Sequence, residues 1–353
     1  MSARTISRRL RPTALVAATV ATAFALGACS GGSGDDASSP AADSTASEGA
    51  FPVTIDSALG EAVIEEKPER VVTWGWSTQD AVLALGVVPV AMPAYKYGGN
   101  EDGVLPWVAE KLDEMGAETP TLLSGGDTSE VPFEEVVAAK PDVILAPYSG
   151  ITQEEFDKLS KIAPVVAYPD QPWALSWQEQ LDIVGDALGL ADEADALVEE
   201  TTAGITAQSD AYPVIQGKSF LYAAANTADQ LNVYRAEDPR VQVVEDLGMT
   251  LSPSVEELDA DPTSGTFWYP LSYENVSKID TDVLIMYFAT QADVDTFVAD
   301  PVIAAMPTVA EGRFAPIVGE SFVMASSAPT ALSIPWMLDQ YVPQLAAAAE
   351  KVS

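Results

Sequence analysis

Aromatic, amide and basic side chains gather where predicted strands end. In α/β lobes the loops after the carboxyl ends of parallel strands line the cleft, so residues there are candidates for ligand contact. Aromatic rings with a few convergent polar groups suit a pocket for a small organic ligand. The candidates are Trp74, Trp76, Tyr95, Lys96, Tyr97 and Tyr148 in the first half, and Asn226, Tyr234, Arg235, Trp268, Tyr269, Tyr287 and Phe322 in the second.

Other residues of similar type are assigned to the framework. Trp107, Trp177 and Trp336 fall within helical periodicity and are predicted to be core residues. Gln79 and Asp80 stand at the start of a predicted helix, where we expect them to act as caps without a ligand role.

Residues for catalysis or metal binding are scarce. The 353 residues contain no histidine and one cysteine, which excludes a serine-histidine relay, a histidine-rich metal site and an intrachain disulfide. Neither a Gly-x-Ser-x-Gly motif nor a phosphate loop is present, and no spacing marks a catalytic pair of carboxylates. We therefore expect no enzyme, no catalytic residue, no protein metal ligand and no cofactor. A lipid-anchored enzyme that uses a carboxylate pair is the alternative from another class.

The charge balance restricts the partners. Lys and Arg total 17 against 53 Asp and Glu, a net charge of −36. Such a chain repels a phosphate backbone, so nucleic acid is excluded as a partner.

The N-terminus predicts export and a lipid anchor. Four arginines between positions 4 and 11 precede an uncharged apolar stretch of residues 14–28, which is shorter than a membrane-spanning helix and is typical of a signal peptide. The stretch ends in LGAC and resembles a bacterial lipobox, in which Cys29 would receive lipid and become the first mature residue. A buried structural thiol is the alternative for Cys29. Arg8 and Arg9 also allow twin-arginine export.

Residues 29–50 are rich in Ser, Gly, Ala, Asp and Pro and read as a disordered tether. Loss of the signal peptide would leave 13 basic against 53 acidic residues and a net charge near −40. We expect a monomer that is lipid-anchored to the outer face of the cell membrane.

Strands alternate with helices through the remaining chain. A hairpin over 52–66 leads to a strand at 68–72, a helix from Asp80 to Leu85, and a strand at 87–90. Further helices are expected at 105–115, 133–139 and 154–162, with strands at 142–146 and 164–168. The second half repeats the pattern, with a strand at 220–225 and a helix at 241–247. This alternation predicts an α/β fold with mainly parallel sheets.

An internal match and a long helix predict two pseudo-symmetric lobes. Glu134 precedes Asp142 by the same interval as Glu274 precedes Asp282, and both aspartates begin a run of three aliphatic residues. A helix that begins at Asp192 and runs to about 209 follows the helix stopped by Gly189. We therefore expect an N-terminal lobe over 51–191, a single inter-lobe helix over 192–209 and a C-terminal lobe over 210–353, with the ligand cleft between them. One stiff helical link predicts little closure on a ligand.

Several motifs together resemble the substrate-binding lipoproteins of iron-siderophore ABC importers, a family that includes cobalamin and haem binders. These are the lipobox and tether, PERVV at 68–72, EVVAAKPD at 135–142 and the helix-linked lobes. The segments ADP at 299–301, MPTV at 306–309 and GRF at 312–314 also match. The resemblance covers about 300 residues and implies capture of a ferric siderophore and its delivery to ABC permease subunits. Iron would be held by the siderophore alone.

The resemblance implies that one surface glutamate on each lobe pairs with arginines of the permease, which places the docking residues at Glu134 and Glu274. Glu135 is the alternative in the first lobe, and ordinary solvated acids in a first helical turn are the alternative for both positions.

The charge of the cleft bears on the ligand. A ferric tris-catecholate carries about three negative charges and would need several basic partners, whereas only Lys96, Arg235 and Arg240 lie near the predicted cleft loops. A neutral or cationic ferric hydroxamate, or a mixed-type siderophore, is therefore favoured. Haem, with Tyr95, Tyr97 or Tyr148 as axial ligand, and cobalamin remain alternatives within the family. A lipid-anchored sensor or adhesion protein remains an alternative from a different class.

Overall fold

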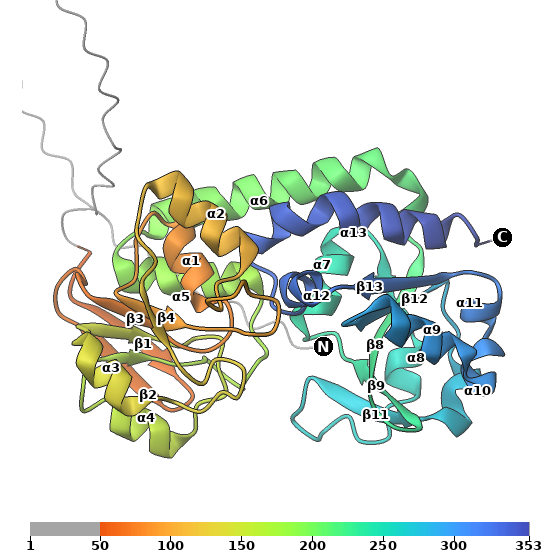
Figure 1. The fold of residues 1–353 in the computed structure, drawn as a ribbon, viewed down its shortest axis with the longest axis horizontal. Coiled ribbons are helices and arrows are strands. Elements are labelled where there is room, and N and C mark those ends of the chain that lie inside the picture. The colour runs from red at the N-terminus through yellow and green to blue at the C-terminus, as the bar shows by residue number, and fades with distance from the viewer. Residues whose placement is uncertain (1–49, 353) are drawn as a thin grey trace, which may run out of the picture. The chain divides into compact units, whose positions relative to one another are not determined.

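The computed structural model describes residues 50–352. The predicted signal peptide, Cys29 and the tether as far as residue 49 lie outside the described residues. The body consists of two α/β lobes, drawn from orange to yellow and from cyan to blue in Figure 1, with a long helix running from one to the other.

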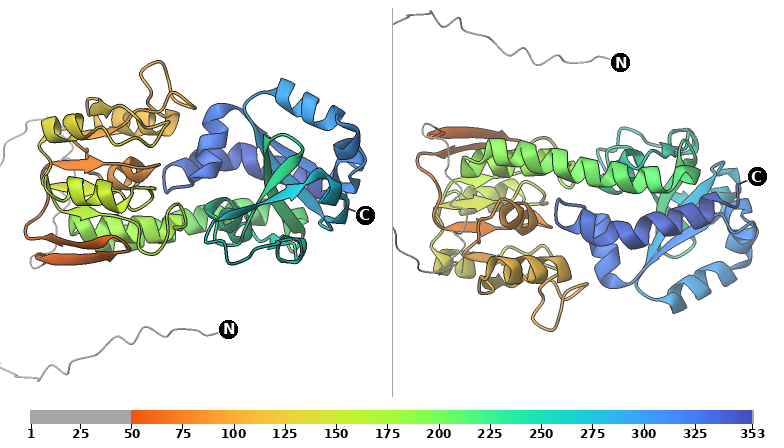
Figure 2. Two further views of the ribbon diagram at one scale, coloured as in Figure 1. Left: turned by 90° about the horizontal axis from the view of Figure 1, so that it is seen from below. Right: turned by 90° about the horizontal axis from the view of Figure 1, so that it is seen from above.

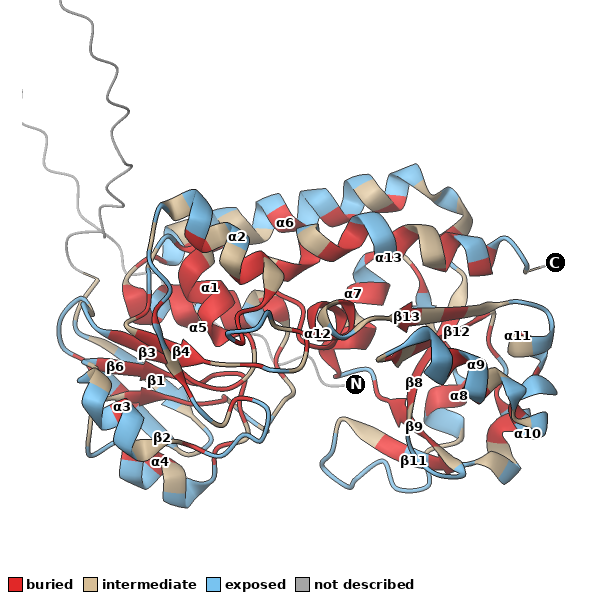
Figure 3. Cartoon of the chain, in the orientation of Figure 1, coloured by how far each residue is buried: buried red, intermediate tan, exposed pale blue. Residues whose placement is uncertain are grey.

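The N-terminal lobe is built on a fully parallel sheet. Its strand order is β5-β4-β3-β6-β7, with bounds Thr121–Leu123, Ala91–Pro93, Val71–Thr73, Val143–Leu145 and Val165–Val166. An antiparallel hairpin of β1 (Val53–Ser57) and β2 (Gly60–Ile64) precedes it. The helices are α1 (Thr78–Ala84), α2 (Pro106–Met115), α3 (Phe133–Ala139), α4 (Gln153–Leu159) and α5 (Trp177–Leu188). Strands β3, β4 and β6 are buried (Figure 3), because helices cover both faces of the sheet.

The C-terminal lobe contains a mixed sheet. Strands β8 (Ser219–Thr227), β12 (Val283–Phe288), β13 (Phe314–Val318) and β10 (Thr250–Leu251) pair in parallel, whereas β9 (Gln230–Tyr234) and β11 (Trp268–Ser272) add antiparallel edges. The expected parallel sheet is therefore fully realised in the first lobe and joined by antiparallel strands in the second.

Helices surround this second sheet and complete the chain. They are η1 (Pro213–Ile215), α7 (Pro239–Asp246), α8 (Ser254–Glu257), η2 (Tyr273–Lys278), α9 (Gln291–Ala299), α10 (Pro301–Ala304), α11 (Pro307–Ala310), α12 (Glu320–Ser327) and α13 (Ser333–Ala349).

The internal match corresponds to equivalent contacts in the two lobes. Asp142 accepts hydrogen bonds from the backbone N–H of Glu69 and Arg70 at 2.7 and 2.9 Å, just before β3. Asp282 accepts from the backbone N–H of Ser219 at 2.9 Å, at the start of β8. Each carboxylate thus ties the beginnings of two adjacent parallel strands, β3 with β6 and β8 with β12. The two repeats differ before the strand, because Glu134 lies in the first turn of an α-helix and Glu274 in the first turn of a 3-10 helix.

Helix α6 (Ala191–Ala211) links the lobes, and α13 packs along it (Figures 1 and 2). Gln208 of α6 donates a hydrogen bond to Asp339 of α13 at 2.9 Å. One apolar cluster also extends across the junction, from Leu83, Met92 and Trp107 to Ile334 and other C-terminal residues. Within residues 50–352, no helix combines the length and apolarity needed to cross a membrane.

Three local predictions are wrong. Residues 87–90 are not a strand; β4 begins at Ala91, after Pro89, which has no N–H to donate to a ladder. Asp192 is not the N-cap of the long helix, because α6 begins one residue earlier and Asp192 lies in its first turn. Gln79 and Asp80 are not caps either: Ser77 occupies the N-cap position of α1, and both side chains point into the interior.

Candidate functional site

An aromatic wall, formed by Trp76, Tyr148 and Trp173, lies in the N-terminal lobe where the strand order of the sheet reverses. Strands β3 and β6 are neighbours there, and a cleft forms at their carboxyl ends in doubly wound sheets. Trp76 follows β3 and Tyr148 follows β6, and the backbone N–H of Trp76 donates to the Tyr148 carbonyl at 3.0 Å. Gly75 has φ +86°, and a Cβ there would overlap that carbonyl, so glycine allows the two loops to touch.

Trp173 completes this wall. Its ring contacts Tyr148 edge-on with centroids 5.5 Å apart and Trp76 with centroids 5.9 Å apart. The Nε1 atom of Trp76 is buried and has no hydrogen-bond partner among the described residues. Trp173 has φ +61°, an uncommon conformation for a bulky residue. Trp76 and Trp173 are half-buried and form a surface suited to contact with a flat or apolar ligand, with Tyr148 packed behind them.

Three of the predicted aromatic candidates are mostly inside the lobe. Trp74 is 2% exposed, and Tyr95 is 2% exposed and donates a hydrogen bond to the Gly75 carbonyl. Tyr148 is 5% exposed. Burial raises the pKa of Tyr95 and of Tyr148 well above the ordinary value. Trp107 and Trp177 are buried, as predicted, and Trp336 is half-buried.

The C-terminal lobe contributes a polar wall, which consists of the hydrogen-bonded side chains of Asn226, Tyr287 and Tyr234. Asn226 at the end of β8 donates to the Tyr287 hydroxyl of β12 at 2.8 Å, and that hydroxyl lies 3.0 Å from the hydroxyl of Tyr234 on β9. Because β8 and β12 are parallel neighbours, their carboxyl ends bring Asn226 and Tyr287 together.

Arg240 on α7 lies against this chain. Its guanidinium centre is 4.4 Å from the Tyr234 ring centroid and 6.0 Å from that of Tyr287, which is cation-π geometry. Its Nη1 donates to Asp238 at 2.7 Å, and its buried Nε has no partner among the described residues. Arg240 is therefore a partly unsatisfied buried cation that can donate to an oxygen-rich ligand.

Arg235 is already satisfied by its own loop. Its guanidinium binds Asp259 at 2.7 and 3.2 Å, Ser264 at 2.9 Å and the Asp261 carbonyl at 2.9 Å, and also contacts Thr266. The residue is 7% exposed. These bonds hold the loop before Trp268, and they occupy the guanidinium that the sequence predicts to contact the ligand.

The other candidates vary in exposure. Lys96 is exposed, Tyr97 and Trp268 are half-buried, and Tyr269 and Phe322 are buried. Asp127 accepts the backbone N–H of Lys96 and Tyr97 at 3.0 and 3.2 Å, which fixes their loop. Burial, with a contribution from Glu320, raises the pKa of Tyr97 to about 12.

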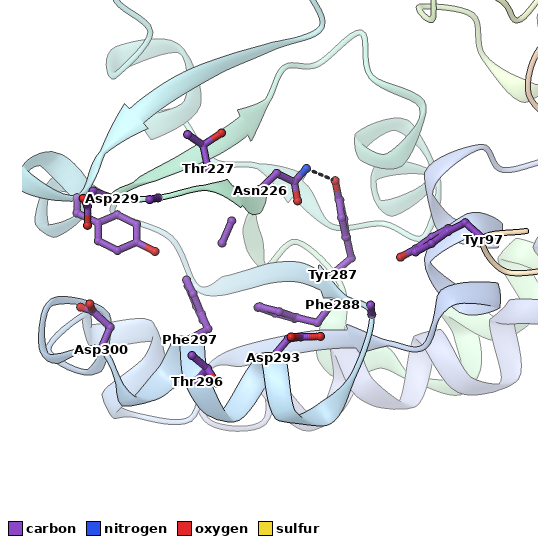
Figure 4. Close-up of a pocket in the computed structure, with 14 residues that line it drawn as sticks. Tyr97, Asn226, Thr227, Asp229, Tyr287, Phe288, Asp293, Thr296, Phe297 and Asp300 are labelled. Atoms are coloured by element: carbon purple, nitrogen blue, oxygen red, sulfur yellow. Dashed lines mark hydrogen bonds between the residues drawn. The ribbon is translucent and has the colours of Figure 1, made fainter. Parts of the chain in front are cut away.

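A cavity of about 540 Å³ opens beside Tyr97, Asn226 and Tyr287 (Figure 4). Tyr97 comes from the N-terminal lobe, and the remaining lining residues come from the C-terminal lobe. Three carboxylates, Asp229, Asp293 and Asp300, are among them, and no basic side chain is. A ligand group in this cavity would meet a negative field and the rings of Tyr273, Phe288 and Phe297.

The two predicted docking glutamates are exposed. Neither the Glu134 nor the Glu274 carboxylate has a hydrogen-bond partner among residues 50–352. Glu135 differs, since its carboxylate accepts from the N–H and hydroxyl of Ser124 at 2.8 and 2.7 Å, and these bonds lower its pKa. The Glu135 carboxylate is thus hydrogen-bonded within its own lobe, whereas the Glu134 carboxylate has no such bond among the described residues.

Trp173 is a site residue that the sequence argument missed, and Arg240 was named there only as a basic residue near the cleft loops. Trp173 lies in the loop before α5, and Arg240 lies in the first turn of α7, so neither directly follows a strand. For the part of the chain that the structure describes, no group of three or more Cys, Asp or Glu side chains is arranged to hold a metal ion.

The family follows from a match over most of these elements. The model of the periplasmic binding protein family matches residues 71–317, from β3 to β13. The chain belongs to this family. The family is one of periplasmic, and so extracytoplasmic, binding proteins.

Relatives in the family include proteins named for iron complexes. The ferric enterobactin-binding periplasmic protein FepB of Escherichia coli O6:H1 is 25% identical over 73% of this chain and 81% of its own length. PiaA of Streptococcus pneumoniae, solved in complex with ferrichrome, is 35% identical, with a TM-score of 0.78 over 85% of this chain and 99% of PiaA. A periplasmic solute binding protein of Mycobacterium smegmatis is 27% identical, with a TM-score of 0.70 over 84% of this chain and 98% of its own.

Proposed function

We propose that this chain is the substrate-binding component of an ABC importer, which captures a ferric siderophore of hydroxamate or mixed type and delivers it to a membrane permease. It would act by binding and handover, without catalysis. The observation that carries the proposal is the pairing of an aromatic wall, Trp76 with Trp173, with a polar wall around the incompletely paired Arg240.

The charges around the cleft support a neutral or cationic ligand. Arg240 is the one basic side chain that packs on the polar wall among the described residues, and Asp238 already offsets part of its charge. The neighbouring cavity carries Asp229, Asp293 and Asp300. A trianionic tris-catecholate would lose hydration there and meet few positive partners, whereas a ferric hydroxamate is neutral or carries a cationic tail.

The relatives agree with this preference in part. PiaA was solved with ferrichrome, a neutral ferric hydroxamate, and shares 35% identity with this chain. FepB, named for a catecholate complex, shares 25%.

Haem is less well supported by the tyrosines. An axial tyrosine must reach the iron as a phenolate, but Tyr95 and Tyr148 are buried with raised pKa values. Tyr97 is the half-buried alternative, and burial raises its pKa to about 12. Cobalamin needs no axial side chain, so a ligand comparison must include it.

Docking is proposed through Glu134 and Glu274. Both carboxylates are exposed and free of intramolecular hydrogen bonds among the described residues, so each can accept a bidentate arginine of a permease subunit. Glu135 would have to break two hydrogen bonds to Ser124 first. The proposal includes Cys29 as the lipid-bearing first residue of a monomer anchored to the outer face of the membrane.

Tryptophan fluorescence tests the ligand class. Ferrioxamine B and ferrichrome are expected to quench emission saturably, because Trp76 and Trp173 lie on the proposed ligand surface. Ferric enterobactin, haem and cobalamin serve as competitors. Tight binding of the catecholate with no response to either hydroxamate would overturn the ligand preference, and no response to any iron complex would overturn the function.

A further inference from the structure

The Asp80 carboxyl group is fully buried where the lobes meet. It stands in the first turn of α1, and its Oδ2 accepts from Trp107 Nε1 of α2 at 2.6 Å and from the Thr330 hydroxyl at 2.9 Å. Its Oδ1 accepts from Gln79 Nε2 at 2.9 Å. Thr330 belongs to the C-terminal lobe, between α12 and α13, so a single carboxyl group joins both lobes.

Thr330 also forms hydrogen bonds to the start of α13. Its Oγ1 accepts the backbone N–H of Ser333 at 3.0 Å and of Leu332 at 3.3 Å while it donates to Asp80. Backbone N–H groups at a helix start otherwise need outside partners. Asp80 therefore anchors, through Thr330, the N-terminus of a 17-residue helix to the N-terminal lobe.

The same loop supports the aromatic wall. Ala328, two residues before Thr330, is buried in a small apolar cluster with Tyr148 and Leu175, and Trp76 and Trp173 pack against that cluster. A displacement of the 328–332 loop would therefore move the support beneath the rings that face the proposed ligand.

Burial, rather than the hydrogen bonds around it, favours a proton on Asp80. Burial raises its pKa from 3.8 to about 7, although its three hydrogen bonds act in the opposite direction. The facing phenol of Tyr95 is neutral in this range, since burial and the Asp80 charge raise its pKa well above the ordinary value. The acids of α5, Asp182 and Asp186, respond to burial and to Asp195 rather than to Asp80.

Charged groups of α2 face elsewhere. Glu110, Asp113 and Glu114 are exposed, and Lys111 pairs with Glu114 at 3.7 Å. The first turn of α13 carries no acidic side chain. The pKa of the buried Asp238, which lies near Tyr148, is also raised by burial, but its carboxylate is paired with Arg240 at 2.7 Å. Among the groups named here, Asp80 is the buried acid that bonds directly to Thr330.

The Gln79 amide oxygen can accept a hydrogen bond from a neutral Asp80. Its Oε1 atom is buried and has no partner among the described residues. A half-turn of the amide places that oxygen against Asp80 Oδ1, where it would accept a hydrogen bond from the protonated carboxyl group.

We propose that Asp80 is a positioning residue for the cleft: it holds the N-terminus of α13 and the 328–332 loop against the N-terminal lobe, and it holds them less firmly when its buried carboxyl group is ionised. The direction follows from linkage. Opening the junction returns the carboxyl group to water and to an ordinary pKa, so opening becomes easier as the pH rises towards about 7. The effect on ligand exchange rests on the proposed function.

Amide hydrogen exchange of the ligand-free protein directly tests whether Asp80 controls opening of the junction between the 328–332 loop, the start of α13 and the N-terminal lobe. After correction for intrinsic exchange rates, opening at residues 330–337 is expected to increase about tenfold from pH 6 to pH 8 in the native sequence. In Asp80→Asn the increase should vanish, with protection at pH 8 equal to the native value at pH 6 or higher, and thermal stability at pH 8 should rise. Asp339→Asn, the same change at an exposed hydrogen-bonded position, should keep the native pH profile.

Thr330→Val provides an independent test. It removes the hydroxyl link but keeps the carboxyl group, so opening should increase at both pH values. A pH profile that persists in Asp80→Asn, or Asp80→Asn protein that fails to fold, would overturn the proposal. Dissociation of ferrioxamine B should also be faster at pH 8 than at pH 6 in the native protein. Absence of binding would refute the proposed function, while the exchange data would still show whether Asp80 controls opening of the junction.

Discussion

The two walls of the site differ in kind. The N-terminal wall is made of rings in edge-to-face contact, Trp76, Trp173 and Tyr148. The C-terminal wall is a hydrogen-bonded chain of Asn226, Tyr287 and Tyr234 around a buried cation. One lobe therefore offers contact area that tolerates many shapes, and the other offers directional donors that select oxygen atoms.

Loss of the cation should have the largest effect on binding. Arg240→Met is expected to weaken ferric hydroxamate binding by about 100-fold, because a charged hydrogen bond in a desolvated site contributes about 2–5 kcal/mol. Alone, the change also leaves Asp238 buried without its partner and lowers the free energy of unfolding. Fluorescence titration measures the affinity.

The double variant Arg240→Met, Asp238→Asn separates the two effects. It should recover much of the thermal stability without recovering binding. Native affinity in this variant would show that the C-terminal wall does not select the ligand by charge.

The docking surfaces test whether the lobes act symmetrically outside the cleft. Glu134→Ala with Glu274→Ala should reduce uptake about tenfold or more, because a pair of bidentate arginine contacts is lost at the permease, while siderophore binding stays native. Uptake of labelled ferric siderophore in cells measures the effect. Glu135→Ala is the matched control. A larger loss of uptake with Glu135→Ala than with Glu134→Ala would assign docking to Glu135 and contradict the proposal.

The aromatic wall should be next in effect. Trp76→Ala is expected to weaken binding about tenfold through lost ring contact, and Trp76→Phe should lose less. Both can be followed by fluorescence of the remaining tryptophans or by calorimetry. Equal affinities of all three proteins would mean that the ligand rests on the C-terminal wall alone.

The acidic cavity should have the smallest effect and distinguish ligand charge. Asp229 is exposed with φ +60°, a conformation that asparagine also tolerates. Asp229→Asn should weaken binding of cationic ferrioxamine B about threefold and leave neutral ferrichrome unchanged, since an exposed charge contributes little more. Parallel titrations check this, and an equal change for both ligands would contradict a role for charge.

The fold was predictable where periodicity and turn residues agree. Strands β3, β6 and β8 and helices α2, α3 and α5 lie where the sequence places them, and Gly189 ends α5 with φ +69°. The matched aspartates also identified equivalent strands, because each carboxylate ties a strand start to its neighbour. The antiparallel edge strands were missed, since pairing direction is set by contacts distant in sequence.

The site was only partly predictable, because position after a strand does not give the direction of a side chain. Tyr97, Asn226 and Tyr287 line the cavity, but Trp74 is buried in the core. Arg235 and Arg240 look equivalent in sequence, yet Asp259 and its loop satisfy the first. Which arginine remains unpaired depends on the tertiary position of distant carboxylates.

Helix α6 has a further consequence, which concerns its length. An α-helix turns by about 100° and advances about 1.5 Å per residue. Inserting or deleting one residue in α6 would therefore rotate the second lobe about the axis of α6 relative to the first lobe. The Gln208–Asp339 bond and the packing of α13 would then be out of phase. The residue count of α6 thus sets which side of one lobe faces the other, and homologues that keep the cleft should vary in their loops before they vary in this count.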